Sequence, residues 1–153
     1  MAEEISDVFI SYAHADDEPP FGLTFGWVTI FVDELKKRLR SKLGGNGARI
    51  WMDYQLAAND KVTDALLNAI SQSRTIVLFM SNGYARSEWC QKELGTFLDH
   101  NSSHKHKESV FIVELYPTNR ENWHPRLQEL TPIQFWRKDL DEVPQLVGWY
   151  AGS

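Results

Sequence analysis

The chain has 153 residues, which is enough for one domain with a sizeable hydrophobic core and too few for two comfortable ones. Apolar residues make up 42% and charged residues 24%, and the formal net charge of −5 offers no basic surface to nucleic acid or anionic lipid. No apolar run approaches the roughly 20 residues that a membrane-spanning helix needs.

The two ends of the chain and its single cysteine bear on where the protein works. The acidic start, Met1 to Glu4, differs from the basic start of a secretory signal peptide. Cys90 is the only cysteine, so an internal disulfide is excluded and a reducing, cytoplasmic location is expected. Residues 151–153 are typical of a linker or a cut end, so we expect a single domain over residues 1–150.

The first half of the chain predicts strands and helices in alternation. Val8, Phe9 and Ile10 in a row are typical of a strand that is covered on both faces. Apolar residues at helical spacing follow a polar loop, and Gly44 then ends the helix. The predicted elements are a strand over 7–12, a loop over 13–26, a helix over 28–43, a strand over 49–53 and a helix over 63–71.

The second half continues the alternation. The uninterrupted, β-branched run from Thr75 to Met80 is the clearest strand in the chain. Ser87 is suited to cap a helix that runs to about His100. The predicted elements are a strand over 75–80, a helix over 87–100, strands over 110–115 and 133–136, and a closing helix over 143–149.

This order of elements predicts an α/β fold, a flavodoxin-like three-layer sandwich with a central five-stranded parallel sheet flanked by helices. The expected strand order is 2-1-3-4-5. Ligands of such sheets bind beyond the carboxyl ends of the strands where the winding reverses, which here means the loops 11–26 and 81–87. Glu93 lies one to two turns into the next helix, with Trp89 four residues earlier on the same face.

Other reactive side chains have simpler interpretations. Cys90 has no Cys-His pattern around it and is expected to be a small buried hydrophobe. The histidines in residues 100–107 are interleaved with lysines, so we expect a solvated loop there and no metal site. The tryptophans are scattered over different elements, which favours core and edge packing over a platform that stacks nucleic-acid bases.

Four motifs, in order along the chain, resemble those of TIR (Toll/interleukin-1 receptor) domains. They are Asp7-Val8-Phe9-Ile10-Ser11-Tyr12; Trp51-Met52-Asp53 with a polar BB loop, Ala65 to Ile70 and Ser73; Tyr84 to Leu94, similar to the plant and bacterial pattern with a catalytic glutamate; and Phe135-Trp136. Two departures stand out. Residues 57–60 replace the Pro-Gly pair common in this loop, and Ala13-His14 replace the basic residues that often follow the first motif.

The resemblance implies an enzyme that cleaves NAD⁺, its substrate, to nicotinamide and ADP-ribose or a cyclic isomer, in immune or anti-phage signalling. It implies that Glu93 is catalytic and that no cofactor or metal takes part. The substrate contacts that we expect are Ser11, Tyr12, His14, Asp53, Ser81 and Trp89. Self-association with other TIR domains is implied too, with residues 53–62 against another copy. The assembly contacts expected there are Tyr54, Leu56, Asn59 and Asp60.

One carboxylate is a sensible minimum for this chemistry. Nicotinamide leaves as a neutral molecule and needs no general acid, so a fixed carboxylate only has to stabilise the ribosyl cation. Alternatives stay open for several of these residues: Glu93 as a solvated helix carboxylate, Trp89 as core packing and His14 as plain surface. Asp53 has an alternative role as a turn residue that caps its loop.

Two other function classes compete with the enzyme. A pure interaction module would form oligomers without releasing nicotinamide. The fold is also compatible with a phosphoacceptor receiver domain that uses Asp16, Asp17 and Asp53. The receiver fits poorly because the acidic pair lies well past the first strand and no lysine closes the fifth strand.

Overall fold

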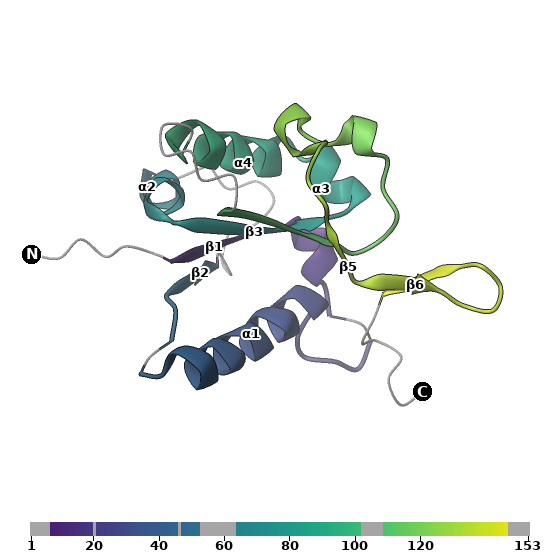
Figure 1. Cartoon of the computed structure of the whole chain (residues 1–153). Helices are drawn as coiled ribbons and strands as arrows, with labels where there is room; N and C mark the ends of the chain where they lie inside the picture. Colours follow the sequence, from purple (N-terminus) through teal and green to yellow (C-terminus); the bar gives the residue numbers. More distant parts are fainter. Residues whose placement is uncertain (1–6, 20, 46, 53–63, 102–108, 147–153) are drawn as a thin grey trace, which may run out of the picture.

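The chain folds into three layers in the computed structural model, which describes residues 7–19, 21–45, 47–52, 64–101 and 109–146. A central sheet separates α1 (Trp27–Leu43) on one face from the helices on the other face (Figure 1). Those helices are α2 (Asp64–Gln72), α3 (Asn82–Arg86) and α4 (Glu88–Asn101). The predicted α/β sandwich is therefore confirmed.

The central sheet is parallel and has the predicted strand order. Its strands are β1 (Val8–Ser11), β2 (Ile50–Met52), β3 (Thr75–Met80), β4 (Val110–Glu114) and β5 (Ile133–Gln134), arranged as β2-β1-β3-β4-β5. In the register, Val8 of β1 lies between Ile50 of β2 and Thr75 of β3. The winding reverses beside β1, so the carboxyl ends of β1 and β3 mark the switch point where ligands of such sheets bind.

Alternate side chains of each strand point into two separate cores. Phe9 belongs to the core beneath α2 and α4, whereas its neighbour Ile10 belongs to the core beneath α1. The same alternation separates Leu78 from Phe79 in β3. Burial on both faces explains why the strands are continuous apolar runs in the sequence.

Short helices occupy two segments that the sequence predicts as loops. The 3₁₀ helix η1 (His14–Asp17) lies within the predicted loop 13–26, and α3 lies within the predicted loop 81–87. Two further 3₁₀ helices, η4 (Arg120–Asn122) and η5 (Pro125–Leu127), follow β4. The switch point is thus built from short ordered turns on both sides.

The predicted closing helix over 143–149 is wrong for its described part. Residues 144–146 form β7 (Pro144–Leu146), which pairs antiparallel with β6 (Trp136–Lys138) beyond the end of β5. Asp139 shapes the turn between them, because its carboxylate accepts the N–H groups of Asp141 (2.8 Å) and Val143 (3.0 Å). Pro144 lacks an N–H and disfavours helical backbone at Val143, so this segment extends instead.

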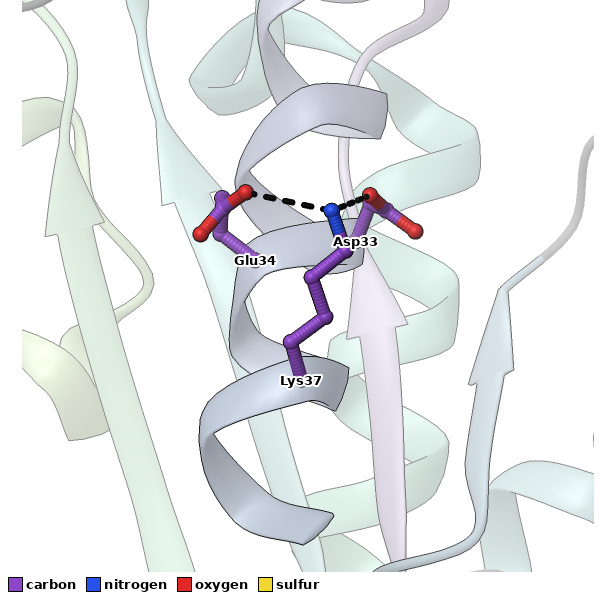
Figure 2. Close-up of polar contacts among 3 residues, drawn as sticks. All are labelled: Asp33, Glu34 and Lys37. Atoms are coloured by element: carbon purple, nitrogen blue, oxygen red, sulfur yellow. Dashed lines mark hydrogen bonds and ion pairs between the residues drawn. The ribbon is translucent and has the colours of Figure 1, made fainter. Parts of the chain in front are cut away.

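The outer face of α1 is a charged surface facing solvent. Figure 2 shows Lys37 between two carboxylates of the preceding turn, Asp33 at 3.1 Å and Glu34 at 3.4 Å. The hydrogen bond and charge of Asp33, with those of Glu34, raise the pKa of Lys37 above its ordinary value. All three side chains are more than half exposed, so these pairs contribute little to stability. Among the described residues, no helix is both long and apolar enough to cross a bilayer.

Candidate active site

A serine lies at the carboxyl end of each of the two strands that form the switch point. Ser11 is the last residue of β1 and is fully buried, and its Oγ lies 2.8 Å from the phenolic Oη of Tyr84 in α3. Ser81 follows β3 directly and is 4% exposed. The structure therefore brings together two of the predicted substrate contacts, Ser11 and Ser81, from segments far apart in the sequence.

Ser81 serves two neighbours at once. Its Oγ accepts the N–H of Tyr84 (3.0 Å), which makes it the N-cap of α3, and its hydroxyl donates to Oδ2 of Asp16 (2.5 Å). Asp16 lies in η1, on the segment that follows β1. The two sides of the switch point are thus joined by a direct side-chain hydrogen bond.

Asp16 is a carboxylate in a partly buried place. Burial raises its pKa above the ordinary value, the hydrogen bond from Ser81 lowers it, and the charge of Asp17 raises it again, with a net upward shift. The protein therefore places a partly desolvated negative charge beside the carboxyl ends of β1 and β3.

Glu93 supplies the second carboxylate from α4. Ser87 caps this helix as predicted, since its Oγ accepts the N–H of Cys90 at 3.1 Å. Glu93 is only 6% exposed and is therefore not a solvated surface carboxylate. Its charge is among the causes that raise the pKa of Tyr84, of which burial is the largest. Glu93 thus lies near the phenol that is bonded to β1.

The thiol of Cys90 is influenced by both carboxylates. Burial raises the pKa of this thiol to about 12; the hydrogen bond with Ser87 lowers it, and the charges of Glu93 and Asp16 raise it further. Cys90 is 1% exposed and belongs to the core beneath α4, as expected for a small buried hydrophobe. A buried thiol with a raised pKa is a poor nucleophile in the folded state, and the charges of both Asp16 and Glu93 influence it.

The remaining predicted contacts lie around this region in different layers. Tyr12 packs in the core beneath α1 and stacks on His14, with ring centroids 5.2 Å apart. Trp89 is half-buried and packs against the core beneath α4. That packing is the structural role expected for Trp89, and a contact of these three side chains with substrate stays a prediction.

Several predicted residues fall outside the described part of the chain. They are the substrate contact Asp53, the assembly contacts Tyr54, Leu56, Asn59 and Asp60, the histidine and lysine run over 102–107, Trp149 and the terminal residues 151–153. The predictions for them stay predictions. Among the residues that are described, no three His, Cys, Asp or Glu side chains gather where they would hold a metal ion.

Two members of the site were missed at the sequence level. In the sequence, Asp16 stands out only as part of the acidic pair of the receiver alternative, and Tyr84 only as the first residue of the third TIR-like motif. Ser81 directly after a strand is a residue type that caps helices and so favours a helix start at Asn82, whereas no local pattern points to Asp16. The Asn82-Gly83 pair, typical of turns, concealed that helix.

Comparison with known proteins places this chain in a family. A family model described as "TIR domain" matches residues 8–147. The chain is 32% identical over 127 residues to disease resistance protein RPV1 of Vitis rotundifolia, covering 73% of this chain and 9% of that protein. It is 35% identical over 89 residues to NAD(+) hydrolase TcpA of Theionarchaea archaeon (strain DG-70-1), covering 58% of this chain and 22% of that protein. The matches thus span small parts of these longer relatives.

Solved structures share the fold. The TIR domains in the structure of the activated Roq1 resistosome superpose with a TM-score of 0.52 at 27% identity, over 79% of this chain and 66% of that one. The TIR domain of the Toll-related receptor TRR-2 from Hydra magnipapillata superposes with a TM-score of 0.54 over 85% of this chain and 84% of that one. Its identity of 16% supports the fold alone. With the family model covering nearly the whole sequence, the chain belongs to the TIR domain family.

Proposed function

We propose that this TIR domain is an NAD⁺ glycohydrolase or cyclase in which Glu93 is the catalytic carboxylate. The products are nicotinamide and either ADP-ribose or a cyclic isomer of it, and the setting is immune or anti-phage signalling. Activity depends on self-association, with residues 53–62 of one copy against another. The domain relates to a protein named as an NAD(+) hydrolase and to disease resistance proteins.

The observation that carries the proposal is the place of Glu93. Glu93 is only 6% exposed and has lost most of its hydration, so a charge on it would act on a neighbouring ribose through a low-dielectric surrounding. Glu93 lies in the second turn of α4, where its charge influences the tyrosine that is bonded to the end of β1. The switch point of an α/β sheet is also where a dinucleotide is expected to bind.

Cleavage of the bond between nicotinamide and ribose requires a negative charge close to the ribose and no general acid. As the bond between nicotinamide and ribose breaks, its electron pair leaves with the pyridine nitrogen, and positive charge develops on the ribose. A preorganised carboxylate in a water-poor site stabilises that charge more strongly than water does. Water or a group of the substrate then attacks the ribose, and this choice sets the linear or cyclic product.

The first test measures nicotinamide release from NAD⁺ by the native chain and by Glu93→Ala at high protein concentration. We expect the variant to lower kcat by about 100- to 1,000-fold, the usual effect of removing one group that stabilises developing charge. Glu88→Ala is the matched control, because it removes an equal charge from an exposed position on the same helix. That control is expected to keep the native rate.

The outcomes separate the enzyme from the interaction module. Release that survives in Glu93→Ala would move the chemistry to another residue. If the native chain, concentrated or clustered, releases no nicotinamide while still forming oligomers, the enzyme is excluded and the interaction module stands. Circular dichroism and thermal unfolding of each variant guard against loss of the fold as the cause.

A further inference from the structure

Four residues at the switch point form one connected set of hydrogen bonds, called here the Asp16 network. It runs from Oδ2 of Asp16 to the hydroxyl of Ser81 (2.5 Å), from the Oγ of Ser81 to the N–H of Tyr84 (3.0 Å), and from the phenol of Tyr84 to Ser11 (2.8 Å). It therefore ties η1 and the end of β1 to α3. No described ion pair involves Asp16, so its hydrogen bond with Ser81 is the contact through which it acts.

The neighbouring carboxylate has a different task. Asp17 accepts the main-chain N–H of Thr29 (2.8 Å) and the Thr29 hydroxyl (2.5 Å) through its two oxygens. It therefore caps the first turn of α1, because Thr29 is the third residue of that helix. The two adjacent aspartates thus have different partners: Asp17 stabilises α1, and Asp16 binds Ser81 at the site.

The Asp16 network continues into the helix that carries Glu93. The carbonyl oxygen of Tyr84 accepts the N–H of Ser87 (3.2 Å) and the side-chain amide of Gln91 (3.2 Å). Ser87 caps α4, and Gln91 precedes Glu93 by two residues. A displacement of Ser81 would therefore move Tyr84 and, with it, the first turns of α4.

We propose that Asp16 is a positioning residue of this site: by holding Ser81 and Tyr84 it fixes the first turns of α4, and hence Glu93, against the end of β1. The inference rests on the proposed function for its effect on catalysis. Asp16 acts through the acceptor oxygen that it offers to Ser81, and its charge is secondary. We therefore expect the variant Asp16→Asn to keep the positioning role, because the asparagine side chain offers an equivalent acceptor oxygen.

The kinetic test compares Asp16→Ala, Asp16→Asn and Asp17→Ala. Because a misplacement of about 1 Å can cost about 100-fold in rate, we expect Asp16→Ala to lower kcat by about 10- to 100-fold while KM changes by less than about 3-fold. Asp16→Asn should recover most of the lost rate. Asp17→Ala should keep the native kcat, although it loses the cap of α1.

A second readout needs no activity. Cys90 is the only thiol of the chain, it is 1% exposed, and it lies in the first turn of α4. Its labelling by a thiol-specific disulfide reagent reports local opening of this turn. Asp16→Ala is expected to raise the labelling rate by about 10-fold or more, whereas Asp16→Asn and Asp17→Ala should label like the native chain.

The two readouts fail in distinguishable ways. If the native protein releases no nicotinamide, the proposed function fails, and the labelling rates alone decide whether Asp16 holds α4. The inference is overturned if Asp16→Ala keeps the native labelling rate, or if Asp17→Ala loosens Cys90 equally. If Asp16→Asn loses as much rate as Asp16→Ala while labelling like the native chain, Asp16 acts by its charge and the positioning role is wrong.

Discussion

Buried ionisable groups gather at the switch point, and each carries a physical cost. Burial raises the pKa of Asp16, of Tyr84 and of Cys90, because a low-dielectric surrounding penalises the charged form of each. Tyr84 and Cys90 avoid this energetic penalty because their side chains stay neutral at pH 7. Two carboxyl groups add to this concentration of poorly hydrated ionisable groups: Asp16 is half-buried and Glu93 is buried. That concentration is typical of functional sites.

The thiol of Cys90 makes stability depend on pH in a predictable direction. Its pKa is about 12 in the folded state against an ordinary 9.0, so below pH 9 both states hold the proton and stability is unaffected. Above pH 9 the unfolded chain releases the proton and the folded chain keeps it, which lowers the free energy of unfolding by about 1 kcal/mol at pH 10. The measurement is urea unfolding of the native chain and Cys90→Ala from pH 8 to 10. A difference between them that stays constant with pH would contradict the assignment.

At the scale of elements, α1 depends on a residue ten positions before its first turn. Gly26 is the N-cap residue and has no side chain to cap with, so Asp17 supplies the missing acceptor from η1. The two segments are in close contact: a Cβ at Gly26 would lie 1.9 Å from the carbonyl oxygen of Asp17. Glycine is therefore required here by the approach of another backbone, which also keeps η1 beside the site.

Gly26→Ala is expected to lower the free energy of unfolding by about 2–4 kcal/mol, since it forces Asp17 away and breaks the cap as well. Asp17→Ala removes only the cap and should cost about 1 kcal/mol. Chemical denaturation followed by tryptophan fluorescence measures both. Equal stability of Gly26→Ala and the native chain would show that η1 and α1 are not in this contact.

At the scale of the whole molecule, one buried carboxylate connects the central sheet to the outer hairpin. Glu114, at the end of β4, accepts the indole N–H of Trp136 in β6 (2.7 Å) and the hydroxyl of Thr118 (3.2 Å). Leu146 of β7 in turn fills the core beneath α1. The hairpin is therefore part of the folded domain, and Figure 1 shows β6 continuing the chain beyond β5.

Trp136→Phe keeps most of the ring but removes the donor, leaving a lone pair of buried Glu114 without its partner. We expect a loss of about 1–3 kcal/mol in the free energy of unfolding by urea denaturation. Leu140→Ala, at the fully exposed tip of the same hairpin, is the control and should leave stability unchanged. A loss as large for Leu140→Ala would mean that hairpin disruption in general, and not this bond, sets the effect.

Those parts of the protein that depend on neighbouring residues could be predicted from its sequence. The run over Thr75–Met80, the helical spacing before Leu43 and the cap at Ser87 predicted β3, α1 and the start of α4, because periodicity and capping are local. The alternation of elements then predicted the sheet order. Glu93 was placed near the switch point by the same reasoning.

The polar contacts at the switch point could not be predicted from the sequence, because they form only when distant segments pack together. The bonds of Ser81 with Asp16 and of Ser11 with Tyr84 join residues 65 and 73 positions apart, and no local pattern specifies such a pair. The β6–β7 hairpin likewise depends on contacts with distant elements. Pro144 is a local feature that disfavours a helix in this segment. Local physics sets the elements and their order, whereas the partners of buried polar groups are chosen when the elements pack together.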